Sequence, residues 1–277
     1  MIKDDNERAA VDDFIRQVTV PILLDIGPTP ALQGTGTLLS VHDKVFLITA
    51  RHVLDGIDPL IFAFPANAQR GHIHTLGSRQ ILKPTDFRID VAAMELQDPE
   101  VLELVRSNWR TLTLANVAAP SQTTADQAVL VAGFPAALTK PKGGWLGGAL
   151  VSTYTQRIPL VPDEMSDSFV YGSYPHNPDF DLYYDHNNEG TGLDGKPVAT
   201  PKLEGVSGAS IWEFVPQSGL LWTVESGARV VGIQSGYVRG KFLRAVNWKA
   251  VALVLDQSDP EISQAVRGAY SLGVADS

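Results

Sequence analysis

Three short motifs of this 277-residue chain carry a histidine, an aspartate and a serine, in that order. The histidine is His52 in Thr-Ala-Arg-His, the aspartate is Asp90 in Asp-Val-Ala, and the serine is Ser207 in Gly-Val-Ser-Gly. A serine hydroxyl is a poor nucleophile at neutral pH, so it needs an imidazole to take its proton and a carboxylate to hold that imidazole in the right tautomer. The motifs therefore predict acyl transfer with Ser207 as nucleophile, His52 as base and Asp90 as the group that orients the base.

The order of these residues limits the frameworks that could assemble them, because unrelated folds build the same geometry from different chain orders. An α/β-hydrolase places its histidine after the serine, but the last of the six histidines is His186, and none follows Ser207. A subtilisin-like order needs an aspartate ahead of His52. Asp25 is available there, although the strand-rich pattern of the chain argues against a parallel α/β sheet.

Strand-like segments dominate the chain between a helix at either end. Apolar spacing predicts a helix over 5–17, a helical insertion at 99–106 and a closing helix over 247–256 with Asn247 as its N-cap. Short apolar runs separated by Gly, Pro and Asp predict strands. They are 18–24, 37–41, 45–49, 60–64, 72–76 and 91–96, followed by 129–132, 149–155, 169–174, 182–184, 210–214, 221–224, 230–237 and 242–246. Strands at this density indicate an all-β architecture of barrels or sandwiches.

At this point the chain resembles the trypsin-like serine peptidases of the chymotrypsin fold, in their bacterial, cysteine-free form. In that family the histidine follows a strand ending in Thr-Ala, the aspartate opens an Asp-hydrophobic-Ala segment, and the serine sits in Gly-x-Ser-Gly. His52, Asp90 and Ser207 match each in turn. The resemblance covers roughly residues 33–256, and three further segments support it: 34–39 ahead of the histidine, 133–135 at the start of a second barrel, and 232–236 along the primary pocket.

The resemblance implies two packed antiparallel six-stranded β-barrels with short N- and C-terminal helices. We expect an N-terminal helix in residues 1–17 and a first barrel in 18–117 that carries the histidine and the aspartate. A second barrel in 118–246, entered through the polar stretch 118–126, would carry the serine, the oxyanion hole and the primary pocket. Residues 247–277 would form a C-terminal helix and tail.

The family pattern also implies supporting roles around the nucleophile. Backbone N–H groups of Gly205 and Ser207 would form the oxyanion hole. Ser235 would lie near Asp90 and donate a hydrogen bond to it. An extended protein or peptide substrate would pair, as an added strand, with the backbone of Ser235, Gly236 and Tyr237.

Two residues near the serine depart from the family pattern. Secreted digestive members switch on when a newly cut N-terminus pairs with an aspartate just before the nucleophile, whereas this chain has Val206. We therefore expect no activation by N-terminal cleavage. Members that cut after lysine or arginine carry an acidic residue six positions before the serine, whereas this chain has Pro201. Trypsin-like specificity is not expected.

Composition excludes several other function classes. The 22 basic residues are scattered among 31 acidic ones and the net charge is −9, which argues against a nucleic-acid surface. No apolar run reaches the roughly 18 to 20 residues of a membrane span, the N-terminus has no apolar signal region, and there is no cysteine. These features predict a cytoplasmic protein without a membrane partner. The chemistry needs no cofactor, and His72 and His74, which share a strand face, lack a third ligand for a metal.

The residue types alone leave a second function open. The chain could be a catalytically idle relative that binds peptides or proteins, or a protease that stays silent until a regulatory protein partner releases it. Ser210, three residues after Ser207, is the local rival nucleophile, but the motif favours Ser207.

Overall fold

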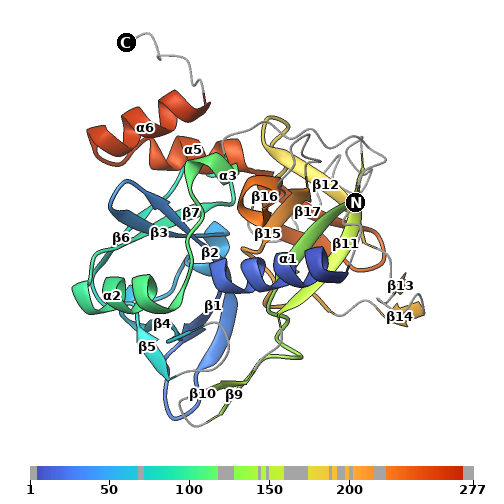
Figure 1. The fold of residues 1–277 in the computed structure, drawn as a ribbon, viewed down its shortest axis with the longest axis horizontal. Helices are drawn as coiled ribbons and strands as arrows, with labels where there is room; N and C mark the ends of the chain where they lie inside the picture. The colour runs from blue at the N-terminus through green and yellow to red at the C-terminus, as the bar shows by residue number, and fades with distance from the viewer. Residues whose placement is uncertain are drawn as a thin grey trace.

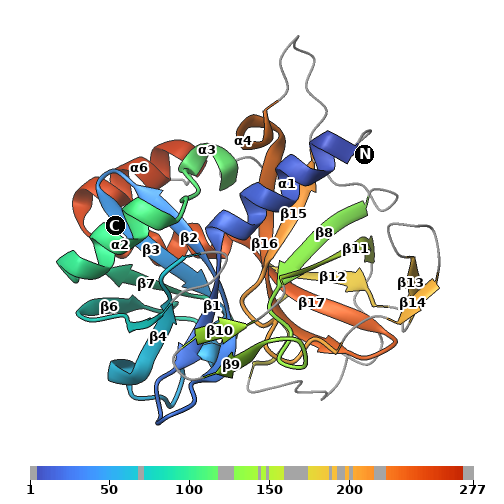
Figure 2. The same cartoon turned by 60° about the horizontal axis from the view of Figure 1, so that its bottom comes forward.

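The computed structural model describes residues 5–67, 72–117, 128–142, 145–147, 150–158, 174–186, 189–191, 197–199, 202–214 and 223–270. Strands from the first half of the chain gather in one sheet, and most strands from the second half gather in a barrel beside it (Figure 2). All neighbouring strands in both units are antiparallel. The all-β fold with two packed units is confirmed.

The first unit is a sheet with the strand order β5-β4-β1-β2-β3-β7-β6. Its strands are β1 (Thr19–Leu24), β2 (Ala31–Val41), β3 (Lys44–Thr49), β4 (Phe62–Pro65), β5 (Ile73–Thr75), β6 (Arg79–Leu82) and β7 (Ala92–Leu96). The sequence led us to expect six strands, and the seventh is the edge strand β6. Three of its four residues are partly or fully exposed, so it lacks the apolar run by which the others were recognised.

One expected strand of this sheet begins late. The segment 60–64 was predicted as a strand, but Pro59–Ile61 form a 3₁₀ turn, η2, and β4 starts at Phe62. The turn begins at Asp58, whose side chain accepts a hydrogen bond from the Leu60 N–H at 2.9 Å. An aspartate at the N-cap followed by proline favours a helical turn over an extended strand.

The second unit is a closed barrel with the strand order β11-β12-β17-β16-β15-β8, which confirms the six-stranded barrel that the resemblance implied there. Its strands are β8 (Ala128–Gly133), β11 (Val151–Ile158), β12 (Asp181–Asp185), β15 (Ser210–Phe214), β16 (Ala228–Val238) and β17 (Phe242–Asn247). Two hairpins lie outside the barrel (Figure 1): β9 (Lys140–Lys142) with β10 (Trp145–Gly147), and β13 (Glu189–Thr191) with β14 (Pro197–Ala199).

Two strands expected in the second half are not seen as such. The prediction at 169–174 lies mostly outside the described residues, and its last residue, Tyr174, is not in a strand. Of the segment 221–224, residues 221–222 lie outside the described part, and Val224 begins the short helix α4 (Val224–Gly227). The polar connection at 118–126 and most of the long segment before Ser207, with Pro201, also lie outside the described residues.

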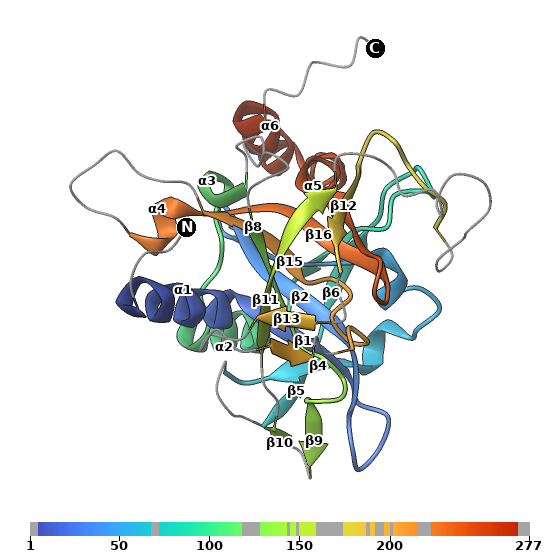
Figure 3. The ribbon, with the colours of Figure 1, turned by 90° about the vertical axis from the view of Figure 1, so that its right-hand side faces the viewer.

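Helices flank the two units. They are α1 (Asp5–Val18), α2 (Pro99–Asn108), α3 (Leu114–Val117), α5 (Trp248–Leu255) and α6 (Pro260–Tyr270). The predicted N-cap of α5 is confirmed, because the Asn247 side chain accepts the Lys249 N–H at 2.9 Å. The helix α6 was not predicted, and it packs beside α5 at one end of the molecule (Figure 3).

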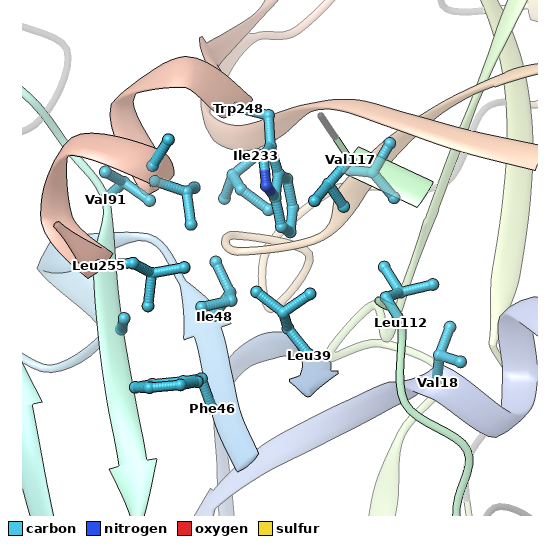
Figure 4. Close-up of a cluster of buried hydrophobic side chains, with 14 of the residues drawn as sticks. Val18, Leu39, Phe46, Ile48, Val91, Leu112, Val117, Ile233, Trp248 and Leu255 are labelled. Carbon is cyan, nitrogen blue, oxygen red and sulfur yellow. The ribbon is translucent and has the colours of Figure 1, made fainter. Parts of the chain in front are cut away.

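A hydrophobic core shared by the two units holds them together. Leu39, Phe46 and Ile48 of the first sheet lie opposite Trp248 and Leu255 of α5 (Figure 4), and all five are at most 1% exposed. The same cluster includes side chains from β8, β15 and β16 of the barrel and from α1. Burying one large apolar side chain contributes about 1.5 to 3 kcal/mol, so this core gives the two units a fixed relative position.

Candidate active site

His52 and Asp90 are brought together by two neighbouring strands of the first sheet. Thr49 at the end of β3 pairs with Ala92 at the start of β7, so the residues just after β3 and just before β7 lie at the same edge. His52 is in the 3₁₀ turn η1 (Arg51–Val53) that follows β3. Its Nδ1 lies 2.7 Å from Asp90 Oδ2, and its backbone N–H donates to Asp90 Oδ1 at 3.0 Å.

Burial and this contact act in opposite directions on the pKa of His52. Burial disfavours the charged imidazole and lowers the pKa of His52, but the hydrogen bond and the charge of Asp90, with help from Asp55, raise it by more. The net result is a pKa above its ordinary value of 6.5. In the neutral ring, a proton on Nδ1 donated to Asp90 leaves Nε2 as a hydrogen-bond acceptor. That is the arrangement a general base requires.

Ser207 comes from the barrel, in the turn that leads into β15, and this turn lies against the first sheet. The Ser207 carbonyl accepts the Thr35 N–H of β2 at 2.8 Å. A methyl group placed on the next residue, Gly208, would come within 3.1 Å of the backbone nitrogen of Ala50, two residues before His52. The two units therefore meet where the predicted nucleophile and base lie. In the described part of the chain, the Ser207 hydroxyl makes no hydrogen bond to His52.

The backbone carbonyls of residues 204–207 are all engaged. The Glu204 oxygen accepts the Ala136 N–H at 2.7 Å, and the Val206 oxygen accepts the Ala209 N–H at 2.8 Å. The remaining two bind to a single residue of the first sheet, Thr35. Its hydroxyl donates to the Gly205 oxygen at 2.9 Å, and its N–H donates to the Ser207 oxygen.

The N–H groups of residues 204–208 are only partly engaged in hydrogen bonds. Val206 donates to the Leu203 oxygen at 2.9 Å, and Gly208 donates to the Gln234 oxygen at 2.8 Å. Those of Glu204, Gly205 and Ser207 have no acceptor among the described residues; Glu204 is exposed to water, whereas Gly205 and Ser207 are half-buried. Buried N–H groups are seldom left unpaired unless a ligand or water takes them, and Gly205 and Ser207 are the donors that the resemblance implied for an oxyanion hole. Gly205 has a φ of +87°, which favours glycine there.

The predicted residues of β16 lie beside the site. Ser235 stands at an irregularity in the pairing of β16 with β17, and its hydroxyl donates to the Arg244 carbonyl at 3.5 Å. Within the described residues it makes no bond to Asp90. Gly236 is buried, and the half-buried ring of Tyr237 packs edge-on against His186, with ring centroids 5.4 Å apart.

Two residues near His52 escaped the sequence reasoning. Tyr174 donates its hydroxyl hydrogen to the Asp55 carboxylate, and its ring centroid lies 6.4 Å from that of His52. Asp55 also accepts from Lys83 at 2.5 Å and lies 3.3 Å from Arg51 Nε. A signal for Asp55 was available in its spacing of four residues from Arg51 on the turn that carries His52. Tyr174 had none, because its partners are distant in sequence.

A buried arginine holds the segment that carries Tyr174. Arg244 in β17 donates to the Tyr174 oxygen at 2.7 Å and to the Pro175 oxygen at 3.0 Å, and it pairs with Asp181 at 2.9 Å. The Arg244 and Asp181 side chains are 3% and 1% exposed. Further along, Asn177 Nδ2 donates to Asp86 of the first unit at 3.2 Å. Residues 174–177 therefore bridge the barrel and the first sheet beside His52.

In the part of the chain that the structure describes, no group of three or more His, Cys, Asp or Glu side chains could hold a metal ion. His72 and His74 are both exposed. None of the described helices combines the length and the apolar character needed to cross a membrane.

Comparison with known proteins identifies the fold of the chain. No protein-family model and no curated protein sequence matches the chain. Among solved structures, a scabies mite inactivated protease paralogue is 15% identical with a TM-score of 0.51 and covers 89% of this chain and 97% of its own. The secreted serine protease VesC of Vibrio cholerae is 15% identical with a TM-score of 0.52, covering 87% of this chain and 46% of its own. A serine endoprotease of Yersinia pestis is 13% identical with a TM-score of 0.50, covering 94% and 66%.

These identities establish the fold and nothing finer. The chain has the chymotrypsin-like double-barrel fold of the trypsin-like serine proteases, as the sequence predicted. One of the similar proteins is named as inactivated, so the fold by itself does not decide between an active protease and an idle one.

Proposed function

We propose that this chain is a serine endopeptidase that hydrolyses peptide bonds with Ser207 as nucleophile, His52 as general base and Asp90 as its orienting carboxylate. The observation that carries the proposal is the backbone of residues 204–208. Every carbonyl of residues 204–207 is engaged, and the N–H groups of the half-buried Gly205 and Ser207, like that of the exposed Glu204, have no acceptor among the described residues. Donors held in advance where negative charge develops usually make the largest single contribution to the rate of acyl transfer.

The reaction follows from these groups. Ser207 Oγ attacks the peptide carbonyl carbon while its proton passes to His52 Nε2, and Asp90 stabilises the imidazolium that forms. The carbonyl oxygen becomes an oxyanion and accepts the Gly205 and Ser207 N–H groups, each worth about 3 to 4 kcal/mol in such a site. His52 then protonates the leaving amine as the carbon–nitrogen bond breaks. Water repeats the sequence on the acyl-enzyme and restores Ser207.

Activation by N-terminal cleavage is not part of the proposal. Val206, where a carboxylate would be needed to pair with a new N-terminus, is 3% exposed and packs in the barrel interior with Leu203 and Ala209. The turn is already held by Ala136 from the barrel and Thr35 from the first sheet. We propose that substrate binding needs no prior cleavage of the chain, only pairing of an extended substrate strand with the backbone of residues 235–237.

The cytoplasmic location stays a prediction.

A second candidate function is a protease-fold protein that binds peptides or proteins and is idle or gated by a partner. Two observations bear on it. The Ser207 hydroxyl makes no hydrogen bond to His52 in the described part of the chain, and one of the structurally similar proteins is an inactivated paralogue. Catalytic hydrogen bonds are often long in unliganded proteases, so the first observation is compatible with both functions.

A fluorophosphonate probe, which labels only activated serines, separates the two. We expect labelling of the wild-type protein and of the control Ser107→Ala, whose exposed serine lies in α2, and none of Ser207→Ala. Hydrolysis of a peptide library should fall by about 10⁴ to 10⁶ in Ser207→Ala with an unchanged circular dichroism spectrum. Labelling that persists in Ser207→Ala contradicts the proposal. A wild-type protein that is never labelled, even in a lysate that could supply its partner, is the idle protein, and labelling only in the lysate identifies the gated form.

A further inference from the structure

Every polar atom of Thr35 in β2 forms a hydrogen bond within or beside the turn of residues 204–208, which carries the proposed nucleophile Ser207 (the nucleophile turn). Thr35 is fully buried. Its N–H donates to the Ser207 oxygen at 2.8 Å, and its hydroxyl donates to the Gly205 oxygen at 2.9 Å. The same hydroxyl accepts the Phe134 N–H at 3.1 Å, and the Thr35 carbonyl accepts the Thr49 hydroxyl at 2.7 Å. One residue of the first sheet thus contacts three segments that form the site.

The hydroxyl bond fixes one of the two peptide planes that flank Gly205. The plane before this glycine, between residues 204 and 205, is held by the bond from the Ala136 N–H to the Glu204 oxygen. The plane after it, between 205 and 206, is held by the Thr35 hydroxyl. Glycine has no Cβ to restrict its backbone, and at a φ of +87° it can leave this conformation easily. The Gly205 N–H belongs to the first of these planes, and the Thr35 hydroxyl, by holding the second, limits rotation of the first about the backbone bonds of Gly205.

The chemistry of this position requires a hydroxyl. Only a group that donates and accepts can bind the Gly205 oxygen and the Phe134 N–H at once. Valine has nearly the shape of threonine and can do neither, whereas serine keeps both bonds. The backbone approaches closely here, since a methyl group on Gly133 would lie 3.2 Å from Thr35 Oγ1. A bridging water has little room to replace the hydroxyl.

We propose that Thr35 is a positioning residue whose hydroxyl holds Gly205 so that its N–H points at the developing oxyanion. Thr35 touches no reacting atom and acts through Gly205. This inference rests on the proposed protease function and deepens it. A competing, purely structural role would have Thr35 join the barrel to the first sheet without influence on the oxyanion.

The chain offers a matched control for the loss of a buried threonine hydroxyl. Thr19 in β1 is also fully buried, and its Oγ1 has no hydrogen-bond partner in the described residues. Thr19 pairs with Thr37 of β2, so it lies in the strand next to the one that carries Thr35. Thr19→Val and Thr35→Val make the same chemical change in one sheet, and only the second removes hydrogen bonds to the nucleophile turn.

The test compares kcat, KM and the affinity for a peptide aldehyde in the full-length variants. Ser207 Oγ adds to the aldehyde carbon, its proton moves through His52 to the new oxygen or to solvent, and the resulting tetrahedral oxygen occupies the oxyanion position. We expect Thr35→Val to lower kcat by about 10²-fold with little change in KM, and to weaken the aldehyde in parallel. Thr35→Ser should recover most of the loss, and Thr19→Val should match the wild type.

Each outcome decides the inference. Thr35→Val with a lower melting temperature but wild-type kcat and aldehyde affinity, measured well below that temperature, leaves a structural role only and overturns the inference. If Thr35→Val does not fold, the difference between Thr35→Ser and Thr35→Ala isolates the hydroxyl, and equal kcat values for those two overturn it as well. A wild-type protein that is never labelled by the fluorophosphonate overturns the protease function and this inference with it. Labelled wild type with unaffected Thr35 variants overturns this inference alone.

Discussion

Tyr174, in the segment before β12, donates its hydroxyl hydrogen to the carboxylate of Asp55, which stands three residues after His52. Partial burial would raise the pKa of Asp55, but hydrogen bonds from Lys83 and Tyr174 outweigh it and lower that pKa below the ordinary value. Asp55 is therefore ionised throughout the neutral range. A second negative charge, besides that of Asp90, then favours the protonated form of His52.

Removing that charge should shift the pH profile of activity. A base must be neutral to act, so kcat/KM rises as His52 loses its proton. Because Asp55 raises the pKa of His52, Asp55→Asn should lower it, and activity should extend to lower pH. The measurement is kcat/KM between about pH 5 and 9. Glu103→Gln on the exposed face of α2 makes the same charge change and should leave the profile in place. A profile that stays fixed or moves to higher pH in Asp55→Asn contradicts the assignment.

The contact between His52 and Asp90 was predictable because each residue has a local motif and because neighbouring strands carry them. Thr35 lies inside a segment that the sequence analysis singled out, but only as a strand leading to the histidine. Its hydroxyl has partners at Gly205 and Phe134, and nothing in a single sequence pairs residues so far apart. The same holds for Tyr174 and Arg244, whose contacts arise only when the barrel closes.

Some features of the fold were missed although a local signal existed. The helix α6 begins at Pro260, directly after Asp259, whose side chain accepts the Glu261 and Ile262 N–H groups. Asp-Pro is a typical N-cap and first-turn pair. The edge strand β6, by contrast, had no local sequence signal. Its residues Arg79 to Leu82 are held in an extended conformation by pairing with β7, and a polar edge strand shows little alternation of apolar residues.

Asp90 offers a direct test of which aspartate orients the proposed base, His52. Asp90→Asn keeps the size of the side chain but places an amide beside His52 Nδ1, which disfavours the tautomer that a base needs, and kcat should fall by about 10⁴-fold. Asp25→Asn is the matched control, because Asp25 is exposed and would be the partner only in a subtilisin-like order. The kinetics of both variants on one peptide substrate suffice. Loss of activity in Asp25→Asn, with Asp90→Asn unaffected, would reverse the assignment.

The buried pair of Arg244 and Asp181 should contribute to stability in a strongly coupled way. Arg244→Met leaves the carboxylate of Asp181, 1% exposed, without its main partner, and removing one member of a buried ion pair costs about 3 to 5 kcal/mol. Adding Asp181→Asn removes the unpaired charge, so the double variant should lose less than the sum of the two single variants. Urea unfolding monitored by tryptophan fluorescence measures each value.

A surface pair in the same chain calibrates this result. Arg267 and Asp256 lie 2.7 Å apart, with side chains 39% and 18% exposed. Exposed pairs contribute about 0 to 1 kcal/mol, so Arg267→Met should change the free energy of unfolding far less than Arg244→Met. Equal losses in the two variants, or strictly additive losses at Arg244 and Asp181, would contradict the role of Arg244 as the group that neutralises a buried carboxylate.

Gly208, directly after the predicted nucleophile, should tolerate no side chain. Its φ is +92°, and a methyl group there would overlap the backbone oxygen of Thr35 and the hydroxyl of Thr49. Both atoms belong to the first sheet, so a Gly208→Ala variant must push the turn away from the strand that leads to His52. We expect a loss of about 3 kcal/mol or more in the free energy of unfolding, because backbone strain and overpacking add. Fluorophosphonate labelling of Ser207 should be lost with it.

Gly268 in α6 is the control, because it is exposed and a methyl group there meets nothing within 4 Å. In a helix, alanine is favoured over glycine by about 0.5 to 1 kcal/mol, so Gly268→Ala should be neutral or more stable and should be labelled normally. Thermal unfolding measures the change in stability of both variants, and fluorophosphonate labelling of the folded protein shows whether Ser207 is still activated. A Gly208→Ala variant that is as stable as the wild type and still labelled would show that the turn carrying Ser207 does not depend on its contact with the first sheet.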